Sequence, residues 1–183
     1  SVAGQIPGMR DELVSLKAWK TVGSRKWQQD GNTWRAAPGR NRGSLLVSPF
    51  PLERFELALE WKTEGETGQG GVYFRYPGSG LPRDRSFKVQ FASDRGVSAD
   101  AFSTGALFGV VPPDLNAVKP TGMWNTLKLR VDGEKVQVVI NGQRVLQTTV
   151  ADPEIPARGH VALDGDFGGI SYRRVLLAPL AGR

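Results

Sequence analysis

The chain has 183 residues, a net charge of +6 and 39% hydrophobic residues. This length supports one sizeable hydrophobic core and is short for two domains. The absence of cysteine excludes a disulfide framework, thiolate zinc sites and cysteine nucleophiles.

The first dozen residues, 1–12, read as a loosely ordered lead-in, and residues 13–183 as a single β-sandwich domain. Within that domain, short apolar alternations separated by glycine and polar turns predict strands. The segments that we expect to be extended are 13–19, 26–37 with a reversal at Asp30-Gly31, 43–49, 55–63, 72–77, 87–92, the two strands within 123–145, 160–164 and 169–180.

The segment 123–145 carries the clearest pattern. Leu127, Leu129 and Val131 alternate with polar residues before a reversal at Asp132-Gly133, and a second alternation ends at Asn141-Gly142. Such dipeptides favour tight hairpin turns. The segment therefore predicts an antiparallel meander with one buried face.

Strands at short intervals without helical crossovers predict an all-β fold of two packed antiparallel sheets. A jelly-roll sandwich of the concanavalin A-like lectin and glucanase type fits best, and a closed barrel is the alternative. The long, turn-rich segment 93–121 is typical of a functional loop. No run of about eighteen apolar residues occurs, so we expect no membrane span.

Four polar residues, Glu60, Arg75, Lys88 and Gln90, each lie between apolar neighbours in the predicted strands. Alternation predicts that they emerge on the face opposite the core. One interpretation is a site for a hydroxyl-rich ligand, because carboxylate, cationic and amide groups supply the donors and acceptors that sugars need. The other is a set of ordinary cross-strand ion pairs on a solvated sheet.

The ordered strings FELALEWKT, GGVYFRYP, FKVQF, STGALFG, GHVAL and GGISYRRVLLAPL, together with the meander, resemble the 3-keto-disaccharide hydrolase domain family. The resemblance implies a concanavalin or laminin-G-like jelly roll related to endoglucanase-type glycoside hydrolases. It also implies a bacterial protein that is secreted or periplasmic. The start at Ser1 without methionine suggests a mature or trimmed product.

The same resemblance assigns site residues position by position. It places the family's strand Glu at Glu60, its Arg at Arg75 and its strand Gln at Gln90. It also implies substrate contacts from Thr104 in the Thr-Gly-Ala loop, from Trp124 before Asn125, and from Arg173 near the C-terminus.

The chain departs from the pattern of the family that it resembles at three places. Gly70-Gly71 replaces Asn-Ser, Lys88 replaces a Glu, and Asp164-Gly165-Asp166 stands where many members have Gln-x-His. Losing an acid weakens the option of two carboxyls flanking the scissile bond. Among the aspartates Asp164 is the preferred substitute acid, although a turn-forming role before Gly165 fits it equally well.

No metal or cofactor is expected. His160 is the only histidine and cannot form a multi-histidine site alone. Asp164-Gly165-Asp166 lacks the further oxygen ligands of a helix-loop-helix calcium site. The scattered Lys and Arg residues are typical of a solvated surface, so we expect no nucleic-acid partner.

The leading functional hypothesis is a hydrolase acting on glycosides such as 3-keto-glycosides, with a carbohydrate as the partner. A sugar ketone acidifies the neighbouring proton, so one base, Glu60, and one cation, Lys88, would suffice, with Asp164 as a further catalytic candidate. The alternatives are a non-catalytic carbohydrate-binding module and a structural domain of a larger exported protein. The oligomeric state is not predicted.

Overall fold

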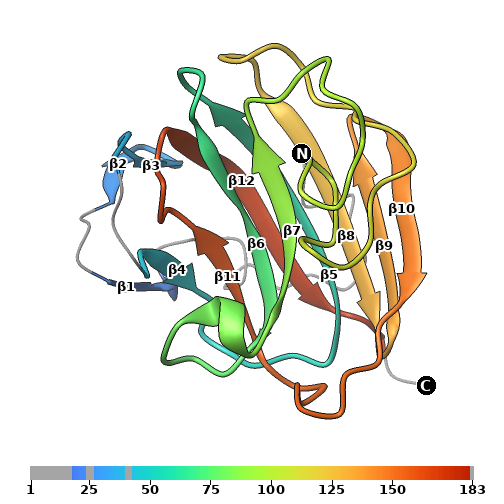
Figure 1. Cartoon of the computed structure of the whole chain (residues 1–183). Helices are drawn as coiled ribbons and strands as arrows, with labels where there is room; N and C mark the ends of the chain where they lie inside the picture. The colour runs from blue at the N-terminus through green and yellow to red at the C-terminus, as the bar shows by residue number, and fades with distance from the viewer. Residues whose placement is uncertain (1–17, 24–26, 40–42, 182–183) are drawn as a thin grey trace.

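The computed structural model describes residues 18–23, 27–39 and 43–181. In this part of the chain two antiparallel sheets pack face to face (Figure 1). One sheet has five strands in the order β1-β4-β11-β6-β7, and the other has seven in the order β10-β9-β8-β5-β12-β3-β2. The predicted all-β jelly-roll sandwich is confirmed, and the two separate sheets replace the closed-barrel alternative.

The five-stranded sheet consists of β1 (Lys20–Val22), β4 (Leu45–Val47), β6 (Gln69–Tyr76), β7 (Phe87–Ala92) and β11 (His160–Asp164). The seven-stranded sheet consists of β2 (Gln28–Asp30), β3 (Thr33–Ala36), β5 (Arg54–Thr63), β8 (Asn125–Asp132), β9 (Lys135–Ile140), β10 (Gln143–Thr149) and β12 (Ile170–Pro179). A short 3₁₀ helix, η3, covers Pro82–Asp84 before β7.

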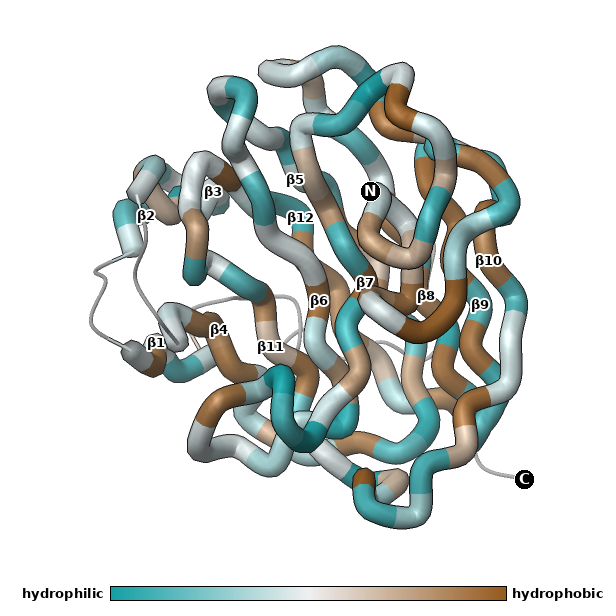
Figure 2. The backbone as a smooth tube through the Cα atoms, in the orientation of Figure 1, coloured by the Kyte–Doolittle hydropathy of each residue, from teal (hydrophilic) through white to brown (hydrophobic). Residues whose placement is uncertain are grey.

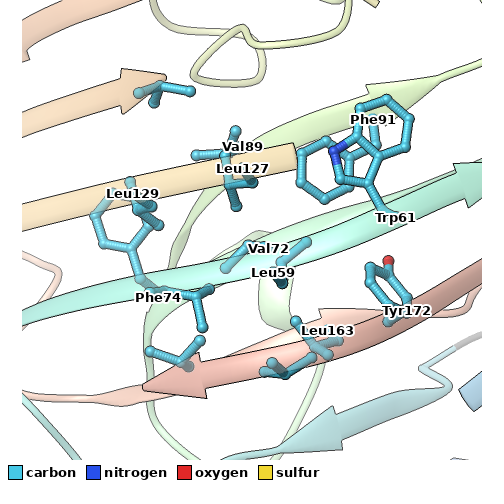
Figure 3. Close-up of a cluster of buried hydrophobic side chains, with 14 of the residues drawn as sticks. Leu59, Trp61, Val72, Phe74, Val89, Phe91, Leu127, Leu129, Leu163 and Tyr172 are labelled. Carbon is cyan, nitrogen blue, oxygen red and sulfur yellow. The ribbon is translucent and has the colours of Figure 1, made fainter. Parts of the chain in front are cut away.

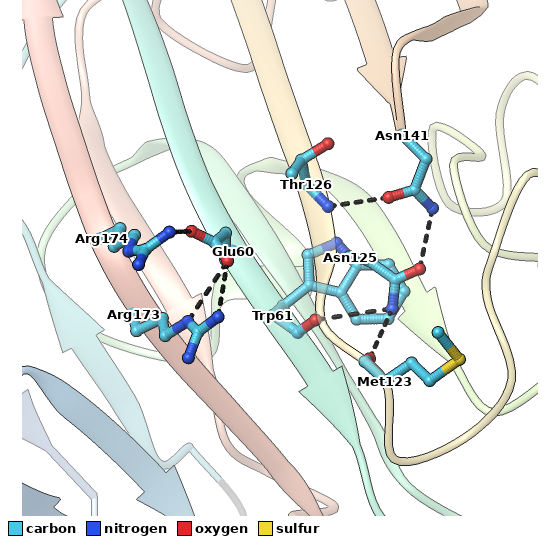
Figure 4. Close-up of polar contacts among 8 residues, drawn as sticks. All are labelled: Glu60, Trp61, Met123, Asn125, Thr126, Asn141, Arg173 and Arg174. Carbon is cyan, nitrogen blue, oxygen red and sulfur yellow. Dashed lines mark hydrogen bonds and ion pairs between the residues drawn. The ribbon is translucent and has the colours of Figure 1, made fainter. Parts of the chain in front are cut away.

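The predicted meander is formed by β8, β9 and β10. Leu127 pairs with Ile140 and Val131 with Val136 across the first hairpin. Asn141 and Gly142 both have positive φ, +51° and +78°, as the second tight turn requires. The side chain of Asn141 is also tied down, because its Oδ1 accepts from Thr126 N and its Nδ2 donates to Asn125 Oδ1, both at 2.9 Å (Figure 4).

The core lies between the sheets and follows the predicted alternation. In β5, Phe55, Leu57, Leu59 and Trp61 are buried in it. Trp61 stacks on Phe91 of the opposite sheet with ring centroids 4.3 Å apart and planes inclined by 7° (Figure 3). Aromatic contacts of this kind join the two sheets and fix their separation.

The long segment 93–121 covers the free edge of β7. Gly105 N donates to Gln90 O, Gln90 N donates to Ala106 O, and Phe108 N donates to Lys88 O. The loop therefore acts as an irregular extra strand and satisfies backbone groups that an open edge would expose. Hydrophobic stretches of this loop run along the outside of the molecule near β7 and β8 (Figure 2).

The lead-in 1–12 and most of the predicted strand 13–19 lie outside the described residues. The reversal predicted within 26–37 is observed as a hairpin, with its turn at Gly31 and Asn32 between β2 and β3. No helix in the described ranges is long and apolar enough to cross a membrane.

Replacing Trp61 tests whether the stacked contact between the sheets stabilises the fold. Trp61 is fully buried, so Trp61→Ala leaves a cavity and should lower the free energy of unfolding by about 3–5 kcal/mol. The control is Phe50→Ala, which removes an aromatic ring that is 49% exposed and should change stability by no more than about 0.5 kcal/mol. Urea unfolding measures both, and equal losses would contradict the role of Trp61.

Candidate functional site

A buried ion pair lies on the outer face of the five-stranded sheet. Lys88 Nζ of β7 is 2.9 Å from Asp164 Oδ2 at the end of β11, and the two side chains are only 9% and 2% exposed. Asp164 Oδ1 also accepts from Asp166 N at 2.9 Å. Because each charge would be costly to bury alone, the two side chains depend on each other.

Two glycines of β6 make this pair possible. Gly71 lies between β11 and β7, paired with Asp164 on one side and with Gln90 on the other. A Cβ on Gly71 would collide with the Lys88 side chain and the Val89 carbonyl. A Cβ on Gly70 would collide with the Tyr172 hydroxyl. The Gly70-Gly71 dipeptide therefore gives room to Lys88 above the sheet and to Tyr172 below it.

Tyr172 supports the site from within the core. It belongs to β12 of the other sheet, and its hydroxyl donates to Asp164 O at 2.7 Å. The same hydroxyl accepts from Gly71 N at 3.0 Å. Burial first, and then the charge of Asp164, raises the pKa of Tyr172 well above its ordinary value, so the hydroxyl stays protonated and continues to donate.

A hollow opens beside the ion pair. Its lining includes Leu45, Tyr73, Leu81, Arg83, Asp164 and Asp166. Burial, followed by the charges of Asp164 and Asp166, raises the pKa of Tyr73 far above the usual tyrosine range. Its hydroxyl is therefore a permanent donor, and none of the described residues accepts a hydrogen bond from it. A ligand in the hollow would meet this donor beside the Asp166 carboxyl and the Arg83 guanidinium.

Gln90 and Thr104 lie on the loop side of the ion pair. Gln90 is buried beside Lys88, its Nε2 contacts Gln69 Oε1 at 3.4 Å, and its Oε1 has no partner. Thr104 holds the loop together, because its hydroxyl donates to Asp94 Oδ1 at 2.6 Å and accepts from Ala92 N at 3.0 Å. With no exposed surface, Thr104 shapes the loop and is closed to a ligand.

Glu60, Arg173 and Trp124 are brought together elsewhere, on the outer face of the seven-stranded sheet. Arg173 Nη2 donates to Glu60 Oε1 at 2.9 Å and Arg174 Nη1 to Oε2 at 2.8 Å (Figure 4). A bulge in β12, where Arg174 has φ +51°, turns both consecutive arginines toward the same carboxylate. The Arg173 guanidinium also lies 3.9 Å from the centre of the Trp124 ring.

Arg75 lies in a second bulge, at the end of β6. Its φ is +59°, and the pairing of β6 with β11 slips between His160 and Ala162. The guanidinium is buried and its Nη2 donates to Gly133 O at 3.0 Å, in the β8–β9 turn of the other sheet. Burial lowers the pKa of Arg75. Arg75 therefore ties one end of the sandwich together.

The predicted juxtaposition of Glu60, Arg75, Lys88 and Gln90 is wrong. Glu60 belongs to the other sheet and faces away, while the bulge takes Arg75 out of the alternation. Lys88 and Asp164 do meet, and Gln90 lies next to Lys88 on the same strand and face.

Tyr73 and Arg83 were not predicted as site residues. The alternation of Val72, Tyr73 and Phe74 places Tyr73 on the outer face, opposite Lys88 in the pairing of β6 with β7, and this signal is visible in the sequence. Arg83 lies in the connection between β6 and β7, where no alternation of residues indicates the direction of a side chain. No cluster of His, Asp or Glu suited to a metal ion occurs among the described residues.

The fold is a β-sandwich of the glycosyl hydrolase-like or carbohydrate-binding type. The chain belongs to the 3-keto-alpha-glucoside-1,2-lyase-like domain family, whose model matches residues 11–178. This confirms the family resemblance. No curated protein matches the chain.

Solved structures share the fold at low sequence identity. A Parabacteroides distasonis protein with a provisional assignment as a glycosyl hydrolase is 21% identical, with a TM-score of 0.70 over 88% of this chain and 99% of that one. A second protein of that organism, with the same provisional assignment, is 14% identical, with a TM-score of 0.77 over 92% of each chain. A carbohydrate-binding module from Bacillus subtilis is 13% identical, with a TM-score of 0.64 over 87% of this chain and 94% of the module.

Separating the two charges of the ion pair should destabilise the protein. Lys88→Met leaves the Asp164 carboxylate buried without its cation, which should lower the free energy of unfolding by about 3–5 kcal/mol. Combining Lys88→Met with Asp164→Asn removes both charges and should recover part of that loss. Urea unfolding at pH 7 measures the three variants, and strictly additive losses would contradict a coupled pair.

The tyrosines predict a loss of stability at high pH. Burial raises the pKa of Tyr73, Tyr76 and Tyr172, the three tyrosines of the chain. Their stabilising contribution is complete below pH about 10, where unfolded tyrosine is protonated, and it falls as the pH rises further. Above pH about 10, each of these tyrosines should lower the free energy of unfolding by about 1.4 kcal/mol for every further pH unit.

Urea unfolding between pH 8 and 11.5, with phenolate absorbance recorded in parallel, tests this dependence. Phenolate should appear together with unfolding, and Tyr172→Phe should give a shallower slope. A native protein that titrates a tyrosine near pH 10 would contradict it.

Proposed function

We propose that the protein binds a glycoside in the hollow on the outer face of the five-stranded sheet. The observation that supports this most directly is the Tyr73 hydroxyl at the wall of the hollow, a protonated donor from which none of the described residues accepts a hydrogen bond. A hydroxyl at the wall of a hollow that donates to no described residue can donate to an oxygen of a bound sugar.

The rest of the lining suits a sugar. Arg83 offers donors at the rim, while Leu45 and Leu81 provide apolar surface for the carbon skeleton. Family membership and the fold shared with a carbohydrate-binding module agree with this class of ligand.

The charges of the site favour binding over ordinary two-carboxylate hydrolysis. The Asp164 carboxylate is neutralised by Lys88 and is nearly inaccessible, and Glu60 is held by two arginines on the other sheet. Such a mechanism needs two carboxyls flanking the scissile bond. In this proposal the protein therefore binds a carbohydrate and does not hydrolyse it by a two-carboxylate mechanism.

Cleavage of a 3-keto-glycoside is the second candidate, and the position of Asp164 beside Lys88 favours it. If the pair opened, the carboxylate would take the proton on C2, which the ketone at C3 acidifies, while the ammonium stabilised the enolate oxygen. The electron pair would form a C1–C2 double bond as the C1–O bond breaks, and the leaving oxygen would take a proton.

Titration calorimetry with methyl α-glucoside and its 3-keto derivative tests the proposal. Tyr73→Phe should weaken binding about fivefold to tenfold, because one hydrogen bond to the ligand is lost. Tyr76→Phe makes the same chemical change at a hydroxyl that donates to Gly80 O, outside the hollow, and should leave affinity unchanged.

Chromatography of the same mixtures separates the two candidates. Binding without product supports the first, whereas product from the 3-keto derivative that disappears in Asp164→Asn supports the second. If the wild type and Tyr73→Phe bound the glucosides with equal affinity, the hollow would be neither the binding site nor the cleavage site.

A further inference from the structure

Two phenylalanines of the 93–121 loop form an exposed apolar surface, here called the shelf. Phe102 is 61% and Phe108 43% exposed. Their rings meet edge to face with centroids 5.4 Å apart and planes inclined by 75°. Val110, in the same turn as Phe108, is exposed as well. Exposed aromatic rings grouped in this way mark a contact surface more often than single exposed side chains do.

The shelf is held in place by hydrogen bonds of its own backbone. Phe108 N donates to Lys88 O, and Gly109 N donates to Ala101 O, both at 2.8 Å. Phe102 N donates to Asp100 Oδ1 at 2.8 Å. A surface that is already ordered loses little conformational entropy when it binds a ligand.

The shelf begins where the hollow ends. Lys88 Nζ lies 5.3 Å from the centre of the Phe108 ring and 5.3 Å from the centre of the Tyr73 ring. One side chain therefore separates the proposed sugar site from the shelf. A group attached to the sugar through its glycosidic oxygen is at the right distance to cross Lys88 and lie on Phe108.

The chemistry of the shelf selects the kind of group. Phenylalanine has no hydroxyl or N–H, so the shelf offers apolar contact and a ring face without the polar contacts that a second sugar needs. The two rings together expose about 200 Å². This area suits one small ring, since a stable dimer needs about 800 Å² from each partner.

We infer that the protein prefers glycosides with an aromatic or otherwise apolar aglycone, which lies on Phe102 and Phe108 while the sugar occupies the hollow. This inference rests on the proposed function and adds the substrate class to it. The aglycone replaces water on the two rings and gains the stacking contact, which should give about tenfold tighter binding than a methyl aglycone.

Titration calorimetry with phenyl α-glucoside and methyl α-glucoside, and with their 3-keto derivatives, measures this preference as a ratio of affinities. The wild type should prefer the phenyl compound about tenfold, and both Phe102→Ala and Phe108→Ala should bring the ratio near one. Phe50→Ala removes a similarly exposed ring that belongs to neither the shelf nor the hollow, and should keep the ratio.

The outcomes distinguish this inference from the function on which it rests. Equal affinities for phenyl and methyl compounds would overturn the aglycone preference and leave sugar binding intact. A preference that survives in the Phe102→Ala, Phe108→Ala double variant would also overturn it. If neither compound binds, the hollow itself is not a glucoside site and both proposals fail. A dimer in sedimentation that Phe102→Ala dissociates would assign the shelf to a second copy of the chain.

Discussion

The Lys88–Asp164 ion pair is the constraint that organises the outer face of the five-stranded sheet. Both charges are removed from water, so their geometry has to be satisfied in full. Gly71 leaves the space through which the lysine reaches Asp164, and Gly70 leaves the space for the Tyr172 hydroxyl that fixes the β11 backbone below. A side chain at either glycine would disturb the pair.

The residues around the ion pair form one coupled set. Lys88 pairs with Asp164, Gly71 leaves room for the Lys88 side chain, and the Tyr172 hydroxyl contacts both Gly71 N and Asp164 O. Together they hold two buried charges that neutralise each other. The polar groups left for a ligand are at the wall and rim of the hollow, with Tyr73 as its fixed donor.

The sequence predicted the fold because alternation and turn residues are local signals, as in β5 and in the meander of β8 to β10. It predicted which face Glu60 and Lys88 take within each strand, but periodicity does not tell which sheet a strand joins. Glu60 and Lys88 consequently lie on opposite sides of the sandwich. Arg75 was misplaced for another reason, because a bulge at a residue with positive φ interrupts the alternation.

The turn at Asn141-Gly142 has a consequence for the lifetime of the protein. An asparagine followed by glycine ages by deamidation when the glycine nitrogen attacks the asparagine side-chain carbon, which requires the amide to rotate freely. Here Thr126 N, Ala117 O and Asn125 Oδ1 hold that amide at both its oxygen and its nitrogen. The hydrogen bonds that close the hairpin thus protect its chemically most vulnerable peptide, and the turn keeps its covalent structure for as long as the meander stays folded.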